Sequence, residues 1–342
     1  MTLLRTSEAS ADGKPAERGE MSSAGLMALL RGVVEARLPG VTVESGADKR
    51  ALLSVLHAHL GATGVFEAGL ALRGLSPHPV LDALGLGSTP IEVLGRWSRL
   101  ERFGHARHRT RIAAEGPGPR VSVEHFALDG GAIAGLDDLF IWGVLLALLA
   151  RAGFSGLRAW IEPPGAEPVL LFANGAVALA DPVPAATARA TFVWAPDHRA
   201  ERCAVDTQDS ATMQAALTRV LRSDLLRRWR IDDVARLLRV SRRSLQRQLA
   251  DEGTSFSERL HRARIDAACA LMTDRRLSLA EIAFCVGFSD QAHFSRLFHR
   301  YLDVPPSAYL ELLEPDPRRI EQAGAIAWEP PAKVQLVKGR VR

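Results

Sequence analysis

The sequence contains two short amphipathic stretches about fifty positions apart, Ser241-Arg-Arg-Ser-Leu-Gln-Arg-Gln-Leu249 and Ser289-Asp-Gln-Ala-His-Phe-Ser-Arg-Leu-Phe298. Each begins with a serine, whose side chain can cap a helix by accepting a hydrogen bond from a free backbone N–H group of the first turn. Each carries arginine and glutamine on one face and leucine or phenylalanine on the other. Because each also follows a shorter amphipathic segment and a tight turn, the pattern predicts two helix-turn-helix units.

The segment before the second stretch contains the signals of a short helix and its end. Ser278 and Glu281 are spaced as a capping box, in which each side chain bonds the backbone N–H of the other residue. The predicted helix runs from this box to Val286. Gly287 fits the left-handed position that ends many helices. Ser289 is then predicted to start the next helix.

The first stretch is preceded by a similar segment. A helix is predicted over residues 231–238, with Asp232 and Asp233 in its first turn, where carboxylates offset the helix dipole. Val240 and Ser241 form the predicted turn into the first amphipathic stretch, 241–249. Further upstream, the apolar spacing predicts a helix over residues 213–228.

A long connecting helix is predicted between the two units, over residues 256–272. About 17 residues at 1.5 Å each form a rod of about 25 Å. Together with the flanking helices, this rod allows two recognition helices roughly 34 Å apart, which is one turn of duplex DNA. The arrangement would let one chain read two successive faces of the major groove.

A recognition helix lies in the major groove and offers side chains from its first turns to base edges. Arginine suits guanine and glutamine suits adenine, because each can make two parallel hydrogen bonds to its base. We expect Leu245, Leu249, Phe294, Leu297 and Phe298 to face inward. The outward candidates for DNA contact are Arg242, Arg243, Gln246, Arg247, Gln291, Ala292, Ser295 and Arg296, with His299 and Arg300 in reach of phosphates.

The charge of the chain is distributed unevenly. Residues 211–312 hold 17 Arg and no Lys against 12 acidic residues, a net charge of +5, and the rest of the chain has a net charge of −1. The whole positive excess therefore lies in one third of the protein, which indicates a polyanionic partner for that part. An ordinary solvated surface is the alternative interpretation of this excess.

Residues 211–310 resemble the DNA-binding domain of the AraC/XylS family of bacterial transcriptional regulators. The match is carried by Ile282-Ala-Phe-Cys-Val-Gly-Phe-Ser-Asp-Gln-Ala-His-Phe-Ser-Arg-Leu-Phe298 and by Val304-Pro-Pro-Ser-Ala-Tyr309. The resemblance implies double-stranded promoter DNA as a partner, with RNA polymerase and a second copy of the chain as further partners. It places base contacts at Arg243, Gln246, Arg247, Gln291, Ser295 and Arg296.

Four positions depart from the family pattern. Arg230 stands where a capping Ser or Thr is common, and Arg239 stands where Gly is common. Asp303 replaces a frequent Gly, although Asp tolerates the left-handed conformation that such a position needs. Leu310 stands where Arg is common. These departures weaken the local signals of the first unit more than those of the second.

The N-terminal part is predicted to be an α+β domain. In the helix predicted over residues 90–103, Trp97 should face the core, whereas Arg96, Arg99 and Arg102 should face solvent. Further helices are predicted from residue 23 to the Pro39-Gly40 pair, over 48–59 and over 136–152, and strands over 108–113, 120–128, 157–162, 169–172, 176–179 and 190–194.

This N-terminal part is similar to the effector-binding domain of the ornithine- and arginine-type members of the family. The similarity is carried by Thr89-Pro-Ile-Glu-Val-Leu94 and by the strand around Val121 to Phe126. It implies binding of a small-molecule effector, dimerisation, or both. Polar candidates for the pocket are Glu124, His125 and Trp142, and the effector-binding residues are otherwise unassigned.

The predicted organisation is a disordered leader (1–22), an α+β effector-binding or dimerisation domain (23–195), a linker (196–210), an all-α DNA-binding domain with two helix-turn-helix units joined by a long helix (211–312), and a mobile tail (313–342). No run of about 18 apolar residues free of charge is present, so no membrane span is predicted. The longest apolar stretch, 139–150, is too short.

The start of the chain lacks an apolar signal region, and three unpaired cysteines are interpreted as buried reduced thiols, so a bacterial cytoplasmic, nucleoid-associated location is expected. No cofactor or metal site is expected.

Two other function classes remain open, a helical protein-interaction adaptor and an enzyme in the N-terminal domain. The sequence lacks a nucleophile elbow, a phosphate loop, a dinucleotide fingerprint and a zinc-protease motif. Asp137 and Asp138, which precede an apolar helix, are interpreted as first-turn caps.

Overall fold

The computed structural model describes residues 24–44, 46–74, 78–104, 107–115, 118–179, 183, 187–196, 212–273 and 277–313. The predicted leader, 1–22, lies outside these residues. Of the predicted linker, 196–210, only Pro196 is described, and of the predicted tail, 313–342, only Leu313 is described.

The N-terminal domain is built from helices and strands in mixed order, as predicted. Its helical segments are α1 (Ala24–Arg37), α2 (Lys49–Leu70), the 3-10 helix η1 (Ala71–Gly74), α3 (Pro79–Gly85), α4 (Pro90–Gly104) and α5 (Gly135–Arg151). Its strands are β1 (His108–Glu115), β2 (Arg120–Ala127), β3 (Arg158–Ile161), β4 (Val169–Ala173), β5 (Ala176–Val177) and β6 (Arg189–Val193). An α+β class for this domain is therefore confirmed.

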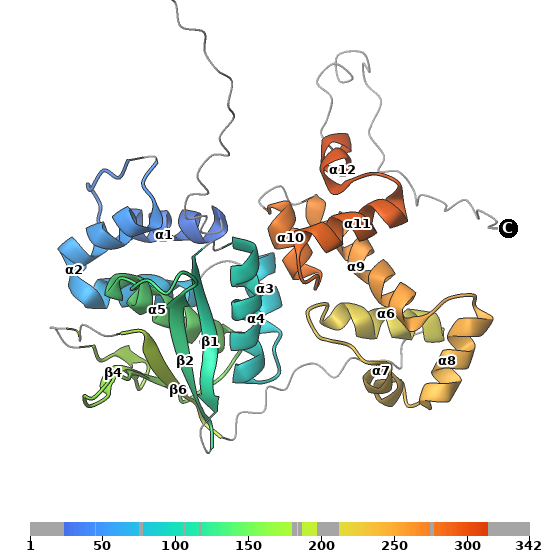
Figure 1. Ribbon diagram of the computed structural model, residues 1–342, viewed down its shortest axis with the longest axis horizontal. Coiled ribbons are helices and arrows are strands. Elements are labelled where there is room, and N and C mark those ends of the chain that lie inside the picture. The colour runs from blue at the N-terminus through green and yellow to red at the C-terminus, as the bar shows by residue number, and fades with distance from the viewer. Residues whose placement is uncertain are drawn as a thin grey trace, which may run out of the picture.

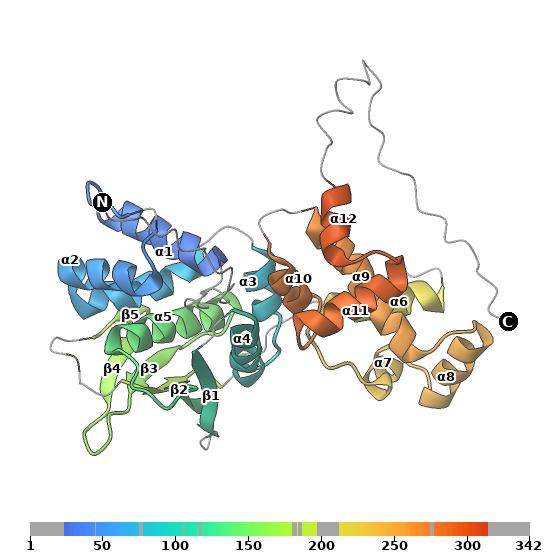
Figure 2. The same ribbon diagram turned by 45° about the horizontal axis from the view of Figure 1, so that its top comes forward.

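The six strands form one antiparallel sheet in the order β1-β2-β6-β3-β4-β5. The last strand, β6, is inserted between β2 and β3, and its Thr191 pairs with Ser122 on one side and with Trp160 on the other. Helices cover one face of the sheet, and no labelled helix covers the other (Figures 1 and 2). The uncovered face holds the one pocket described below.

Helix α5 forms the centre of this domain and is buried from Asp137 to Leu149. It crosses α2 at two glycines, where the backbones come very close. A Cβ atom added to Gly143 would lie 2.2 Å from the carbonyl oxygen of Phe66, and one added to Gly69 would lie 2.2 Å from that of Phe140. Only residues without a side chain fit this crossing.

The helix predicted over residues 48–59 is present and ends at a kink, and the helical segment that follows the kink was not predicted. Gly61 has non-helical dihedral angles (φ 66°, ψ −170°), but the chain resumes the helix after this kink and continues to Leu70. Within the described residues, Lys49–Gly74 is long and apolar enough to cross a membrane, and half of that window is buried inside the protein. Packing of α2 on α5 accounts for its apolar character.

The interpretation of Asp137 and Asp138 as helix caps is wrong. Helix α5 has no side-chain cap, and Asp137 pairs instead with Lys49, with its Oδ1 atom 2.6 Å from Nζ. Asp138 lies 2.7 Å from Nδ1 of His125 and accepts a hydrogen bond from Thr187 at 2.5 Å. These carboxylates therefore tie α5 to α2 and to the sheet.

The C-terminal domain is entirely helical. Its helices are α6 (Met213–Ser223), α7 (Ile231–Leu237), α8 (Arg242–Asp251), α9 (Phe256–Met272), α10 (Leu279–Cys285), α11 (Gln291–Leu302) and α12 (Pro306–Leu312). Helix α9 has the bounds predicted for the connecting helix. Helix α6 ends five residues earlier than predicted, because Asp224 leaves the helical conformation and starts a turn.

Two buried cores support these helices. One is formed by α6, α7 and α8 with Ala263 of α9. The other joins α10 and α11 to the core of the N-terminal domain. The ribbon shows α10 lying next to α3 and α4 (Figures 1 and 2), where the rings of Phe103 and Phe284 meet edge to face with centroids 6.0 Å apart.

Arg96 is the clearest failure of the sequence-based prediction in α4. Its side chain was expected in solvent, but the residue is 4% exposed. Its Nη1 atom donates to the carbonyl of Ala83 at 2.8 Å, and Nη2 pairs with the carboxylate of Asp224. Helical periodicity identified the face of α4 that packs on its own domain, and the C-terminal domain covers part of the opposite face.

Candidate nucleic-acid interface

Helix α8 has the two-sided character predicted for it. Ser241 caps the helix by accepting a hydrogen bond from the backbone N–H of Ser244 at 3.0 Å. Leu245 and Leu249 are buried, with 1% and 4% of their surfaces exposed. The four predicted contact residues on the opposite side are all exposed: Arg242, Arg243, Gln246 and Arg247.

Helix α11 is also two-sided, but its cap is not the predicted one. Asp290, rather than Ser289, accepts a hydrogen bond from the backbone N–H of His293 at 2.7 Å. Ser289 donates its hydroxyl to the Asp290 carboxylate at 2.9 Å. The His293 bond is the main cause that lowers the pKa of Asp290 below its ordinary value. The capping aspartate therefore stays ionised at the helix N-terminus, where a negative charge is favourable.

The outward and inward residues of α11 follow the prediction closely. Phe294, Leu297 and Phe298 are buried. Ser295 is half-buried, and the other predicted contact residues are exposed: Gln291, Ala292, Arg296, His299 and Arg300. The structure thus places the ten candidates on two helix faces, four on α8 and six on α11.

The turns before α8 and α11 have the same backbone hydrogen bonds. After α7, the N–H of Arg239 bonds the carbonyl of Arg236 at 3.2 Å, and that of Val240 bonds Ala235 at 3.0 Å. After α10, the N–H of Gly287 bonds the carbonyl of Phe284 at 2.8 Å, and that of Phe288 bonds the carbonyl of Ala283 at 3.0 Å. This pattern is the Schellman motif, which requires a left-handed residue. Arg239 (φ 55°) and Gly287 (φ 83°) occupy that position.

Replacing Arg239 by Gly should stabilise the C-terminal domain by about 1 kcal/mol, because glycine adopts the left-handed conformation without the steric cost that a Cβ atom brings. Hydrogen exchange of amides in α7 and α8 in the full chain measures this change. Arg236→Gly removes the same charge from an interior position of α7, where glycine costs about 1 kcal/mol. Faster exchange in Arg239→Gly would contradict the prediction.

The charges on the two exposed faces are largely unpaired. Arg242 lies 3.3 Å from Asp232. Arg243, Arg247, Arg296 and Arg300 make no ion pair with any residue that the structure describes. Exposed guanidinium groups without acidic partners are suited to phosphate or guanine acceptors.

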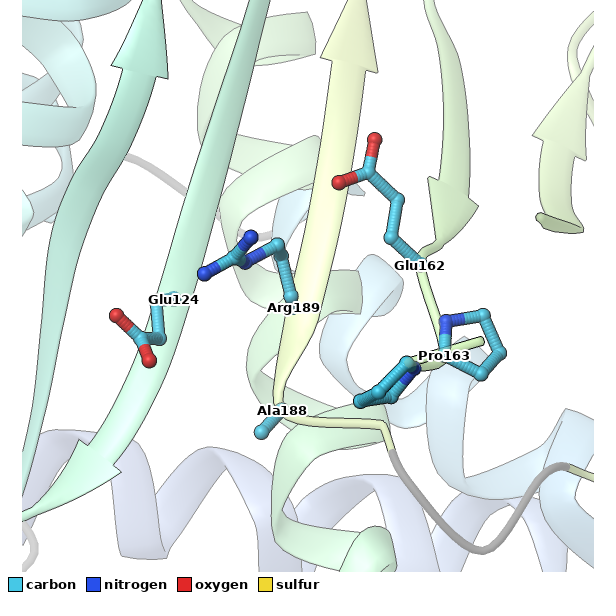
Figure 3. Close-up of a pocket in the computed structure, with 6 residues that line it drawn as sticks. Glu124, Glu162, Pro163, Ala188 and Arg189 are labelled. Atoms are coloured by element: carbon cyan, nitrogen blue, oxygen red, sulfur yellow. The ribbon is translucent and has the colours of Figure 1, made fainter. Parts of the chain in front are cut away.

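Of the three pocket candidates in the N-terminal domain, Glu124 lines the pocket that the structure describes on the open sheet face. The pocket has a volume of about 460 Å³ and is lined by Glu124, Glu162, Pro163, Pro164, Ala188 and Arg189. Figure 3 shows Glu124 on β2, Arg189 on β6 and Glu162 directly after β3, on the side of the sheet away from the helices. His125 is 2% exposed, and Trp142 is fully buried, with its Nε1 atom donating to the carbonyl of Thr187 at 2.8 Å.

Comparison with known proteins places the similarity in the C-terminal domain. Residues 234–311 match the sequence family described as "Helix-turn-helix domain". The TCP pilus virulence regulatory protein of Vibrio cholerae is 33% identical over 94 residues, which are 28% of this chain and 34% of that protein. The ornithine utilization regulator of Pseudomonas aeruginosa is 38% identical over 101 residues, 29% of this chain and 30% of that protein. The chain therefore spans about a third of the length of these relatives.

Two solved structures are also similar in part. A crystal structure of ToxT from Vibrio cholerae is 30% identical, covers 30% of this chain and 39% of its own, and has a TM-score of 0.29. The transcriptional regulator CdpR from Pseudomonas aeruginosa is 19% identical, covers 85% of this chain and 99% of its own, and has a TM-score of 0.28. Both scores are too low to indicate a shared overall fold, so the sequence match carries the assignment. Residues 234–311 form a helix-turn-helix domain of the kind found in AraC-family transcription regulators.

Proposed function

We propose that this chain is a sequence-specific, DNA-binding transcription regulator of the AraC type. In this proposal, α7–α8 and α10–α11 are two helix-turn-helix units, and α8 and α11 are their recognition helices. The main support is the exposed arginine and glutamine face of each helix, set opposite a buried apolar face and preceded by the same kind of turn. Two such faces are what contact with two successive segments of the major groove requires.

The connecting helix supports the same proposal. Helix α9 contains 17 residues, which corresponds to a length of about 25 Å. It starts with a capping box formed by Ser255 and Glu258, so its N-terminal end is well defined. A regular helix of this length suits the spacing expected between two adjacent contacts on duplex DNA.

For the N-terminal domain we propose a sensing role. The pocket on the open sheet face lies within the usual volume range of small-molecule sites, about 300–1,000 Å³. It combines two carboxylates with the Arg189 guanidinium, which favours a polar effector over an apolar one. RNA polymerase and a second copy of the chain are the further proposed partners, and the bacterial cytoplasm is the proposed location.

The adaptor alternative predicts that the two exposed faces bind protein rather than nucleic acid. Among the described residues, no exposed large apolar side chain belongs to α8 or α11, whereas the core of a protein interface is enriched in aromatic residues and methionine. For an enzyme, the His125–Asp138 pair is the nearest approach to a general base. Both side chains are nearly inaccessible, at 1% and 3% exposure, so a substrate would not reach them.

Footprinting on the DNA upstream of its own gene, with and without candidate metabolites, tests the proposed function directly. The chain should protect two adjacent groove segments and should bind this DNA more tightly than random duplex. Affinity should fall as salt is raised, because phosphate contacts release counterions. Equal affinity for both DNAs at every salt concentration would contradict the proposal.

Gln246→Ala and Arg296→Ala should each weaken binding to the specific DNA by about 1–3 kcal/mol and relax base preference at one position. Titrations by fluorescence anisotropy on specific and mismatched duplexes measure both effects. Arg222→Ala is the matched control, since it removes an exposed arginine from α6, which is neither of the proposed recognition helices. If the control variant and Arg296→Ala behave alike, α11 is not a recognition helix.

A further inference from the structure

The two domains meet where α10 packs on α3 and α4, and also at one short turn. Residues 224–230, here called the α6–α7 turn, connect α6 to α7. Arg96 of α4 pairs with Asp224 at the start of this turn, and their side chains are only 5% and 14% exposed. Arg99, also in α4, donates to the carbonyl of Leu226 at 3.1 Å. The N-terminal domain therefore holds both a side chain and the backbone of this turn.

The same turn is connected to the first recognition unit. Asp224 accepts a hydrogen bond from the backbone N–H of Arg227 at 3.2 Å, and its carbonyl accepts one from Nε1 of Trp229 at 2.8 Å. Trp229 is 8% exposed and packs in the core that supports α7 and α8. A displacement of Asp224 would therefore move the base of the first unit.

The turn also contacts the second unit. The carbonyl of Leu225 accepts a hydrogen bond from Arg264 of α9 at 3.3 Å. Gly287, in the turn before α11, lies so close that a Cβ atom on it would be 2.0 Å from the same carbonyl oxygen. Helix α10 itself packs on α4 through Phe284 and Phe103. The N-terminal domain thus holds the segments that precede both recognition candidates.

The α6–α7 turn is surrounded by arginines, and Asp224 supplies a negative charge there. Three guanidinium groups converge on the α6–α7 turn, those of Arg96, Arg99 and Arg264. Burial is the largest cause that lowers the pKa of Arg99, and burial followed by the nearby Arg99 lowers the pKa of Arg264 to about 10. Removing the Asp224 carboxylate would leave the buried Arg96 charge uncompensated, which strongly disfavours the closed junction.

The docked N-terminal domain does not cover the recognition faces. Arg243 and Arg247 on α8, and Arg296 on α11, remain exposed while the domains are in contact. Docking therefore leaves these arginines open to solvent. The contacts of the α6–α7 turn offer a route by which docking acts on the orientation of the two units.

We propose that the Arg96–Asp224 ion pair is an interdomain latch that presets the relative orientation of the two recognition helices. Arg96 and Asp224 are positioning residues that act through the α6–α7 turn and touch no base. The effect of the latch on DNA affinity rests on the proposed function. Two recognition helices whose relative orientation is fixed before binding lose less conformational freedom when they bind DNA than two that move independently. The N-terminal domain would thereby set DNA affinity without contacting DNA.

Asp224→Asn in the full chain tests the latch, because the amide oxygen can still accept the Arg227 bond while the charge is lost. We expect faster hydrogen exchange at amides of α4 and α10, a larger radius of gyration by X-ray scattering, and about tenfold weaker binding to the upstream DNA. The salt dependence of binding should stay unchanged, because no phosphate contact is removed. Arg96→Met should produce the same changes. Arg102→Met, an exposed arginine on the same helix, should produce none.

The double variant Arg96→Met/Asp224→Asn separates a latch from two unrelated defects. It should bind DNA no more weakly than Asp224→Asn alone, because the uncompensated charge is gone. Additive losses would overturn the latch, and so would unchanged exchange and scattering in both single variants. Opening of the junction without a change in DNA affinity would overturn the positioning role. If the unmodified chain does not prefer its upstream DNA, the proposed function fails, while exchange and scattering still decide whether the ion pair holds the domains together.

Discussion

Gly143→Ala should destabilise the N-terminal domain by about 3 kcal/mol, with a drop in its melting temperature of roughly 6–12 °C. The added Cβ atom would lie 2.2 Å from the carbonyl oxygen of Phe66 and 2.9 Å from the backbone nitrogen of Leu70. Both neighbours are backbone atoms of α2, so no side-chain rotation can relieve the contact. The two helices must separate, and separation opens the core between them.

Thermal unfolding of the full chain, followed by circular dichroism and by hydrogen exchange in α2 and α5, measures this effect. Gly95→Ala is the matched control, because Gly95 lies inside α4 and a Cβ atom there would meet nothing within 4 Å. The control should be neutral or stabilising by about 0.5–1 kcal/mol, since alanine favours helix. An equal response from both variants would show that the crossing of α2 and α5 is looser than described.

Gly287→Ala should destabilise the C-terminal domain by about 3 kcal/mol through two separate costs. Its φ of +83° is left-handed, which costs an alanine about 1–2 kcal/mol. Its Cβ atom would also lie 2.0 Å from the carbonyl oxygen of Leu225, and relieving such an overlap costs about 1–3 kcal/mol. The turn before α11 and the α6–α7 turn would have to move apart, so DNA binding should weaken as well.

Gly253→Ala isolates the first of these costs. Gly253 is also left-handed, with a φ of +69°, but a Cβ atom there would meet nothing within 4 Å. It should lose only about 1–2 kcal/mol. Hydrogen exchange in α10 and α11 measures the difference between the variants. Equal losses in the two variants would mean that the contact between Gly287 and Leu225 contributes nothing.

The sequence predicted the local structure of the C-terminal domain well. Helix α9 begins and ends where the apolar spacing and the capping residues indicated. The Ser278–Glu281 capping box and the left-handed Gly287 are present as predicted. Arg239 also takes the left-handed conformation that the family pattern implies for its position. These features depend on residues close together in the chain, so local sequence is sufficient to specify them.

Local signals failed where two neighbouring residues offered similar chemistry. Ser289 and Asp290 can both cap a helix, and sequence alone favoured the serine. Asp290 caps α11 in the structure, and Ser289 supports it through a hydrogen bond to its carboxylate. The side chain that caps is decided by the backbone angles at the start of α11, with Asp290 at φ −158° and ψ 159°.

By itself, the sequence predicted most of the described helices and strands and the buried faces of most of them, but not α3, α12 or the part of α2 after its kink. It also predicted the ten candidates for DNA contact, of which all but the half-buried Ser295 are exposed. Only the tertiary structure shows which distant segments of the chain pack against the other faces of these helices and strands. Arg96 was expected in solvent and is buried against Asp224, 128 positions away, and Gly143 needs its missing side chain only because α2 crosses α5 at that point. Periodicity reports that one side of an element is apolar, but a polar residue is buried when a distant segment supplies its partner, and that pairing depends on how the whole chain packs.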